Sequence, residues 1–231
     1  MREVINNSVY FGVVISLISY IIGLMVKKKF KYSILNPLLV AIIIVILILT
    51  IFKIDYETYN QGGRYLSFLL TPATVCLAIP LYQQLDLLKK NFKAIMAGIL
   101  TGSLSNLIVI FALSLMFKFT HEVYASLLPK SITTAIGLAV SGEIGGIPTI
   151  TVAAISVTGI SGNVIGEAVC KLFRIKNPIS VGIALGTASH AIGTARALEL
   201  GEVQGAMSSL SIAVAGLITV VLAPVFANFS L

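Results

Sequence analysis

The sequence predicts an all-α polytopic membrane protein with about seven transmembrane helices, one re-entrant element, an inverted repeat and two broken helices. Of the 231 residues, 57% are hydrophobic and only 11% are charged, whereas a soluble domain carries about 25% charged residues. The net charge of +7 comes mainly from Lys and Arg in short loops beside apolar runs, which is a signal of topology. We expect one transmembrane domain, residues 1–231, with residues 1–117 as its first half and 118–231 as its second.

The first half contains four apolar runs of about 20 residues, which is enough to cross the hydrocarbon core. The expected spans are residues 7–26, 33–52, 65–84 and 94–117. The third span should be broken or kinked near Pro72 and Pro80, because proline lacks a backbone N–H and clashes with the preceding turn. Residues 53–64 are expected to form a polar loop, and residues 81–93 a separate interfacial piece.

The second half is expected to cross the membrane at residues 149–173, 179–200 and 203–226. Residues 131–148 are too short and too rich in glycine for an ordinary span, so we expect a half-helix that dips into the membrane and returns. The many small residues in these spans suit close helix packing in lipid. Cys76 and Cys170 fall in apolar stretches and are expected to be small core residues.

The charges of equivalent loops invert between the two halves. Residues 70–96 can be aligned weakly with residues 186–207, and positive loops mark the cytoplasmic side of a membrane. Basic clusters at 27–31, 89–93 and 174–176 are then all cytoplasmic if residues 131–148 do not cross. This pattern is typical of the inverted repeats of secondary transporters. Eight full crossings are the alternative, and they place residues 174–176 on the other side.

Two polar interruptions, Thr71–Thr74 and Thr187–His190, are expected to face each other near the middle of the membrane. Non-helical backbone at that depth is tolerated only where it is buried in protein or lines a wet cavity. A helix that starts there points free N–H groups at the cavity and favours an anion. The alternative is that Pro, Ser and Thr simply kink packed helices.

Three ionisable residues near these interruptions have two interpretations each. His190 either changes charge near neutral pH and couples transport to protons, or it is a hydrogen-bonded packing group. Arg196 either binds a carboxylate, or it pairs with Glu199 or Glu202. Glu167 either relays protons or pairs with Lys171 at the i,i+4 spacing.

The sequence argues against an enzyme. The glycine-rich stretch GEIGGIP lacks the Lys-Ser/Thr ending of a phosphate-binding loop. His121 and His190 lie far apart with no clustered carboxylates, so no metal site is expected, and no nucleophile–base set is apparent. We expect no cofactor, and no nucleic acid as a partner.

Four stretches resemble the LrgB/CidB family of bacterial membrane proteins. They are LLTPATVCLAIPLYQQ, LPKSITTAIGLAVSGEIGGIPTIT, TGISGNVIG and GIALGTASHAIGTARALELGEVQGAMSSLSIAVAGL. The resemblance covers nearly the whole chain after about residue 69, and the first 60 residues match only in hydropathy. The chain departs from the family pattern at Ala135 and Glu167, where the family usually has proline.

The resemblance implies two different functions. The family was named for holin-like or antiholin-like control of murein hydrolase export and autolysis, with a small LrgA/CidA-type membrane subunit. Its plant relatives are plastid glycolate/glycerate translocators, and bacterial members are linked to small carboxylates such as pyruvate. The first interpretation is therefore a proton-linked secondary transporter of small monocarboxylates in the bacterial inner (plasma) membrane, and the alternative is the antiholin-like regulator.

The expected partners are a small carboxylate anion, membrane lipid, an LrgA/CidA-type subunit and a second copy of the chain in a homo-oligomer, with a dimer favoured. The expected substrate-binding residues lie in the two interruptions and in residues 131–146. They are Thr71, Pro72, Thr74, Ser131, Thr133, Thr134, Glu143, Gly145, Gly146, Thr187, Ser189, His190, Thr194 and Arg196.

Overall fold

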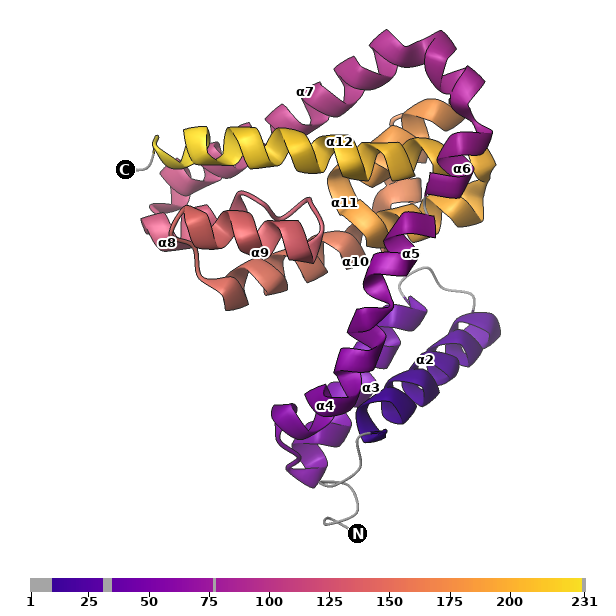
Figure 1. Cartoon of the computed structure of the whole chain (residues 1–231), viewed down its shortest axis with the longest axis vertical. Coiled ribbons are helices and arrows are strands. Elements are labelled where there is room, and N and C mark those ends of the chain that lie inside the picture. Colours follow the sequence, from indigo (N-terminus) through magenta and orange to yellow (C-terminus); the bar gives the residue numbers. More distant parts are fainter. Residues whose placement is uncertain (1–9, 31–34, 77, 230–231) are drawn as a thin grey trace. The chain divides into compact units, whose positions relative to one another are not determined.

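The structure, a computed structural model, describes residues 10–30, 35–76 and 78–229, apart from the side chains of residues 70, 71, 74, 80 and 81. Every regular element in these ranges is an α-helix (Figure 1). The chain forms two compact units, Met1–Cys76 and Leu77–Leu231. The predicted all-α class is confirmed, and the helices are compatible with a polytopic membrane protein.

The first unit contains four helices: α2 (Phe11–Phe30), α3 (Pro37–Phe52), α4 (Tyr56–Phe68) and α5 (Leu70–Cys76). Helix α3 begins at Asn36, whose side-chain oxygen accepts from the backbone N–H of Leu38 at 2.8 Å and of Leu39 at 3.3 Å. Pro37 occupies the first helical position, where its missing N–H costs nothing. Local sequence therefore fixes where this span starts.

Helix α4 contradicts the expectation of a polar loop over residues 53–64. Its glycines allow close packing on α2, because a Cβ atom added at Gly12 would lie 2.8 Å from the backbone nitrogen of Gly63. The hydroxyl groups of Ser16 and Tyr59 lie 2.8 Å apart at the same contact. The glycine pair at 62–63, within the expected loop, is a helix-packing contact in the structure.

The segment at residues 65–84 is broken near Pro72 and Pro80, as predicted. Helix α4 ends at Phe68, α5 covers Leu70–Cys76 and α6 covers Ala78–Gln83. Pro72 and Pro80 are each the third residue of a short helix, where a backbone N–H has no intrahelical acceptor. The break therefore precedes each proline, and the expected interruption at Thr71–Thr74 itself is wrong, because α5 covers those residues. Cys76 is exposed on α5 rather than in a core, because this short helix has no apolar cluster around it among the described residues.

The second unit contains α6 and six further helices: α7 (Leu85–Phe117), α8 (His121–Leu127), α9 (Thr134–Glu143), α10 (Pro148–Leu172), α11 (Pro178–Leu200) and α12 (Glu202–Ala227). Helix α12 packs along α11 and α7, and it also contacts α8 and α9 (Figure 1). One core cluster joins α7, α8, α9 and α12 around Leu107 and Tyr124, and a second joins α7 and α12 around Ile95 and Met207.

Helix α7 has 33 residues, which corresponds to about 50 Å and exceeds the thickness of the hydrocarbon core. Residues 81–93 are not one separate piece, because residues 85–93 are continuous with the span at 94–117, while their interfacial position stays a prediction. No proline or glycine lies between Leu85 and Lys93, and nothing in that stretch therefore ends the helix.

Residues 131–148 form a half-helix, as predicted. Helix α9 has ten residues and spans about 15 Å, which is too short to cross a membrane. A turn at 144–147 reverses the chain into α10, and the hydroxyl groups of Ser141 and Thr151 lie 2.6 Å apart across the two helices. The re-entrant path of this hairpin in a membrane stays a prediction.

Helix α11 is broken where the sequence predicts. Ser189 has φ −133° and ψ 16°, and His190 has φ 41° and ψ −140°, so neither residue is helical. The break packs closely on α10: a Cβ atom added at Gly159 would lie 2.7 Å from Cε1 of His190, and one at Gly162 would overlap Oγ of Ser189. Glycines on α10 thus make room for the non-helical residues of α11.

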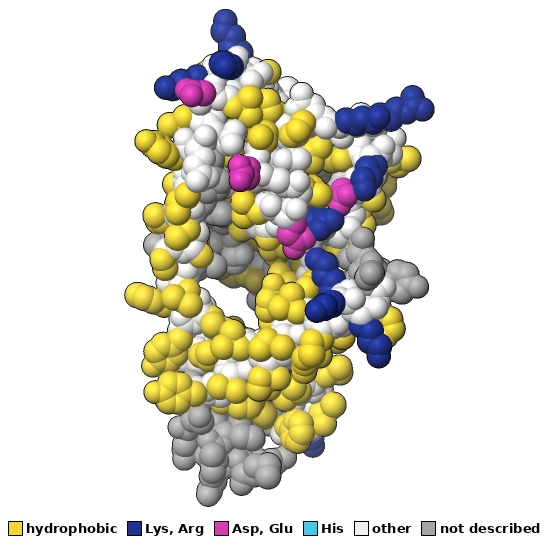
Figure 2. Space-filling model, turned by 90° about the vertical axis from the view of Figure 1, so that its right-hand side faces the viewer, with side chains coloured by type: hydrophobic (Ala, Val, Ile, Leu, Met, Phe, Trp, Pro, Cys, Tyr) yellow, Lys and Arg dark blue, Asp and Glu magenta, His cyan; other side chains and the backbone are white. Residues whose placement is uncertain are grey.

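Four helices among the described residues have the length and apolar composition to cross a membrane, namely α2, α7, α10 and α12, and α3 is a shorter apolar helix. Large apolar side chains are exposed along them, among them Leu217 and Val221 on α12. Figure 2 shows hydrophobic side chains over much of the visible surface. A surface of this kind is suited to lipid, because soluble proteins rarely expose such extensive apolar area.

The close contact between α11 and α12 at Gly186 leads to a prediction about stability. A Cβ atom added at Gly186 would lie 2.8 Å from the Cα atom of Ser208, whereas one at Gly142 meets no atom within 4 Å. We expect Gly186→Ala to destabilise the protein by about 1–3 kcal/mol, since an overpacked contact costs this much. Gly142→Ala is the matched control and should be neutral or slightly stabilising. The melting temperature of each variant can be measured in detergent by size-exclusion chromatography after heating. Equal melting temperatures for Gly186→Ala and Gly142→Ala would contradict the close contact between α11 and α12.

Candidate functional site

A cleft of about 930 Å³ lies between α7, α10 and α11 in the second unit. Along α7 it runs from Ala94 to Val109, a distance of about 22 Å. Four of its lining residues are glycines, at positions 98, 102, 162 and 166, so the facing helices leave space that side chains would otherwise fill. Its hydroxyl-bearing lining residues are Thr101, Ser105, Ser131, Thr158, Ser161, Ser180, Thr187 and Ser189.

One end of the cleft holds a cation and an amide. Nζ of Lys130 donates to Oγ of Ser131 at 3.2 Å, and that hydroxyl donates to Oδ1 of Asn106 at 3.1 Å. Lys130 is partly buried in the turn between α8 and α9. Among the described residues that line the cleft, Lys130 and Cys170 are the ionisable ones. This end therefore has positive charge and hydrogen-bond donors without a carboxylate.

Thr187 lies on the α11 side of the cleft, just before the break. Its side chain is 93% buried, and its Oγ1 atom has no hydrogen-bond partner among the described residues. A Cβ atom added at Gly102 would lie 2.9 Å from Cγ2 of Thr187. Gly102 is one helical turn from Asn106 on α7, so Thr187 lies near the polar end of the cleft.

The two residues at the break have different surroundings. Ser189 lines the cleft. His190 does not line it: Nε2 of His190 lies 3.0 Å from the carbonyl oxygen of Ile155 on α10. Because a carbonyl only accepts, Nε2–H donates there, and the imidazole is 4% exposed. These contacts favour the packing interpretation of His190.

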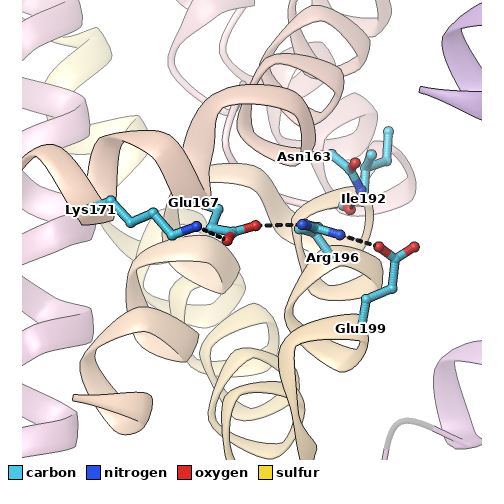
Figure 3. A network of polar contacts seen from close by, with 6 residues as sticks. All are labelled: Asn163, Glu167, Lys171, Ile192, Arg196 and Glu199. Atoms are coloured by element: carbon cyan, nitrogen blue, oxygen red, sulfur yellow. Dashed lines mark hydrogen bonds and ion pairs between the residues drawn. The ribbon is translucent and has the colours of Figure 1, made fainter. Parts of the chain in front are cut away.

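Arg196 lies in an ion-pair network and not in the cleft (Figure 3). Its guanidinium pairs with Glu167 on α10 and with Glu199 on α11. Nζ of Lys171 lies 2.6 Å from Oε1 of Glu167. The two cations and two carboxylates balance, so the pairings of Arg196 with Glu199 and of Glu167 with Lys171, both foreseen as alternatives, are confirmed.

The same figure shows the amide of Asn163 beside the backbone of Ile192. Nδ2 of Asn163 donates to the carbonyl oxygen of Ile192 at 2.7 Å. Thr194, another expected site residue, is fully buried, with Oγ1 3.0 Å from the carbonyl oxygen of His190 and 2.7 Å from Oγ of Ser208. Thr194 therefore ties the second half of α11 to α12 and does not line the cleft.

The expected residues of α9 and its turn lie apart from the cleft, with the exception of Ser131. Thr133 precedes α9 and gives no side-chain cap, and Thr134 and Glu143 are exposed. Gly145 has φ 81°, a conformation that favours glycine. Gly146 packs on the backbone of Ser126, because a Cβ atom added at Gly146 would lie 2.9 Å from the nitrogen of Ser126. The two glycines shape the turn between α9 and α10.

The expected residues of the first interruption lie in the first unit. Pro72 is exposed on α5, and the side chains of Thr71 and Thr74 lie outside the described residues. The approach of this interruption to the one in α11 stays a prediction. Of the expected site residues, the structure brings Ser131, Thr187 and Ser189 together in one cleft.

Sequence reasoning missed two residues of the cleft as site residues. Lys130 lies in the family-like stretch that begins LPKSITT, and Asn106 lies in the expected span at 94–117, but neither is among the expected binding residues. A usable signal existed for Asn106, because polar groups inside apolar spans are rare and usually functional. For Lys130 the proximity to α7 comes from the turn after α8, which sequence spacing does not reveal.

Comparisons with known proteins agree on one family. The model of the LrgB-like family matches residues 16–229. A protein of Bacillus cereus (strain B4264) named antiholin-like protein LrgB is 43% identical over 221 residues, which cover 95% of this chain and 96% of the relative. A protein of Bacillus anthracis (strain CDC 684 / NRRL 3495) with the same name has the same identity and coverage.

No solved structure matches the chain. The family match and the relatives extend over both units, including the residues of the cleft, and they confirm the resemblance seen in the sequence. The chain therefore belongs to the LrgB-like family.

Proposed function

We propose that this protein binds a small monocarboxylate in the cleft between α7, α10 and α11 and carries it across the bacterial inner membrane. The observation that supports the proposal is the polar end of the cleft, where Lys130 lies without a carboxylate partner among the described residues. Lys130 is partly buried, and because removing a cation from water is costly unless it is paired, an anionic ligand would relieve part of that cost. The break in α11 at Ser189 lies in one wall of this cleft, and broken helices commonly form the substrate sites of secondary transporters.

A second candidate is the antiholin-like regulation named for the relatives, and the comparisons support it more directly than they support transport. In this function the chain would control a membrane lesion and murein hydrolase export together with an LrgA/CidA-type subunit. A homo-oligomer, with a dimer favoured, suits either function. The cleft favours the transport function over the regulatory one. A regulator of membrane lesions has no need of a partly buried cation, Lys130, that faces a cleft large enough for a ligand.

For the path through the membrane we propose seven crossings with α9 and its turn as the re-entrant element, and an inverted relation between the two halves. The length of α9 supports this, since about 15 Å cannot span the hydrocarbon core. The cytoplasmic side would then hold the lysines at the end of α2 and the basic residues 174–176 between α10 and α11.

Flux through the chain alone tests transport. Purified protein in proteoliposomes should take up radiolabelled lactate, and Gly102→Leu should reduce uptake to background because the new side chain fills the cleft beside Thr187. Gly142→Leu is the matched control, since Gly142 has open space around it, and it should keep wild-type uptake. No uptake by wild-type protein, with a change in vesicle leakage only when an LrgA-type subunit is added, would favour the regulator.

Cysteine accessibility tests the topology. In a Cys76→Ser/Cys170→Ser background, Ile175→Cys and Lys28→Cys should both react with a membrane-impermeant maleimide only from the cytoplasmic face. Asp55→Cys should react only from the opposite face. Reaction of residue 175 from the same side as residue 55 would replace seven crossings with eight and remove the inverted repeat.

Proton linkage is tested at His190. The imidazole is hydrogen-bonded to Ile155 and lies away from the cleft, so we expect His190→Gln, which keeps an N–H for that carbonyl, to preserve the pH dependence of lactate uptake within about a factor of two. His190→Ala should instead lower stability by about 1–3 kcal/mol, because it removes a buried side chain together with its hydrogen bond to Ile155. A pH profile that becomes flat in His190→Gln would assign the coupling proton to His190.

A further inference from the structure

Lys130 lines the cleft and has no carboxylate partner among the described residues. The network on the other side of α11 contrasts with it, because Arg196 and Lys171 are balanced there by Glu167 and Glu199. For Lys130 the described residues supply only a hydroxyl, Oγ of Ser131 at 3.2 Å. An ammonium group has three N–H donors, so two remain for other acceptors.

The neighbours of Lys130 are oriented as further donors. The hydroxyl of Ser131 accepts from Lys130 and donates to Oδ1 of Asn106. This direction turns the amide oxygen of Asn106 toward Ser131 and leaves its NH₂ group, which has no hydrogen-bond partner among the described residues, as a donor. Asn106 lines the same cleft. Two N–H groups of Lys130 and two of Asn106 are therefore available at one end of it.

A third donor is the hydroxyl of Thr187, which is an independent observation. The side chain is 93% buried, and Oγ1 has no partner among the described residues. Buried hydroxyls without a partner are rare, and each calls for a specific explanation, such as a ligand or an ordered water. Thr187 faces Gly102, one turn along α7 from Asn106, so it belongs to the same end of the cleft.

We propose that Lys130, Asn106 and Thr187 form the anion subsite of the cleft, and that Lys130 supplies the charge that selects a carboxylate over a neutral molecule of the same shape. The inference rests on the proposed transport function and specifies its site. It transfers the charge-bearing role from His190 and Arg196, which have protein partners, to Lys130. Ser131 is a positioning residue, since it directs both the ammonium and the amide.

Equilibrium binding to purified protein tests the subsite, with radiolabelled lactate as the probe and unlabelled lactate or lactamide as competitors. Lys130→Gln should weaken lactate binding about 10- to 100-fold, because a charge-assisted hydrogen bond is lost. The same variant should bind lactamide as wild-type protein does, so that the preference for the anion disappears. Lys130→Arg should stay within a few fold of wild-type, and Lys176→Gln, which removes an exposed lysine outside the cleft, should have no effect.

Lys130→His gives a second readout that a purely structural role would not produce. An imidazole ordinarily titrates near pH 6.5. Above that pH the variant loses its positive charge, so its lactate affinity relative to wild-type protein should fall about tenfold for each unit of pH. A constant ratio between pH 5.5 and 8 would overturn the role of Lys130, and this comparison remains valid if Lys130→Gln does not fold.

The outcomes separate the subsite from the proposed function. Lactate binding by wild-type protein with unchanged affinity in Lys130→Gln would overturn the subsite alone and leave transport standing. No binding of lactate by wild-type protein would overturn both. The same measurement in nanodiscs of phosphatidylcholine and of phosphatidylglycerol addresses the lipid: loss of lactate binding only in phosphatidylglycerol would assign Lys130 to a lipid headgroup and overturn the subsite.

Discussion

A helix that is broken inside a membrane protein must satisfy its backbone groups with protein atoms, because lipid offers no hydrogen bonds. The second unit is organised around this requirement in α11. The side chain of His190 donates to the carbonyl oxygen of Ile155 on α10, and Asn163 of α10 donates to the carbonyl oxygen of Ile192. Helix α10 therefore holds α11 at the break and supplies a partner for its backbone just after it. Gly159 and Gly162 allow α10 to approach closely enough for these bonds. The break is thus a supported conformation and depends on residues of two helices.

The same closeness explains why the cleft exists. Backbones that approach through glycine leave no side chain to fill the space beside them, and Gly98, Gly102 and Gly166 line the cleft for that reason. Thr187 and Ser189 flank the break and face this space. A cavity beside a break in a helix is an arrangement in which many secondary transporters bind their substrates, and the geometry is therefore in keeping with the proposed function.

Charge balance distinguishes two polar clusters that look alike in the sequence. Around Arg196 the charges cancel within the protein, so no ligand is needed to balance them (Figure 3). Around Lys130 they do not cancel among the described residues. The sequence favours Arg196 as an anion site because arginine binds carboxylates well, but the carboxylates that it binds here are its own Glu167 and Glu199.

The sequence predicted the helical class, helices at 149–173, 179–200 and 203–226 and the break at Ser189, because these follow from long apolar runs interrupted by small polar residues. It misassigned residues 53–64, since a glycine pair that favours a loop also allows two helices to touch. It also could not place Lys130 beside Asn106, because that pairing depends on how the turn after α8 folds back on α7. Long-range pairing of this kind is tertiary information that periodicity does not contain.

The hydroxyl of Thr187 has no hydrogen-bond partner among the described residues, and this argues against a purely structural role for the wall of the cleft. A buried polar group without a partner costs about 1–3 kcal/mol, and Val, which has nearly the same shape, would avoid that cost. A purely structural wall would therefore gain stability from Val at this position. The hydroxyl is accounted for if its partner is a ligand that comes and goes, since a permanent protein partner would block the exchange. The cost in stability and the capacity to bind then have one physical origin, an incomplete hydrogen-bonding shell that a small anion completes.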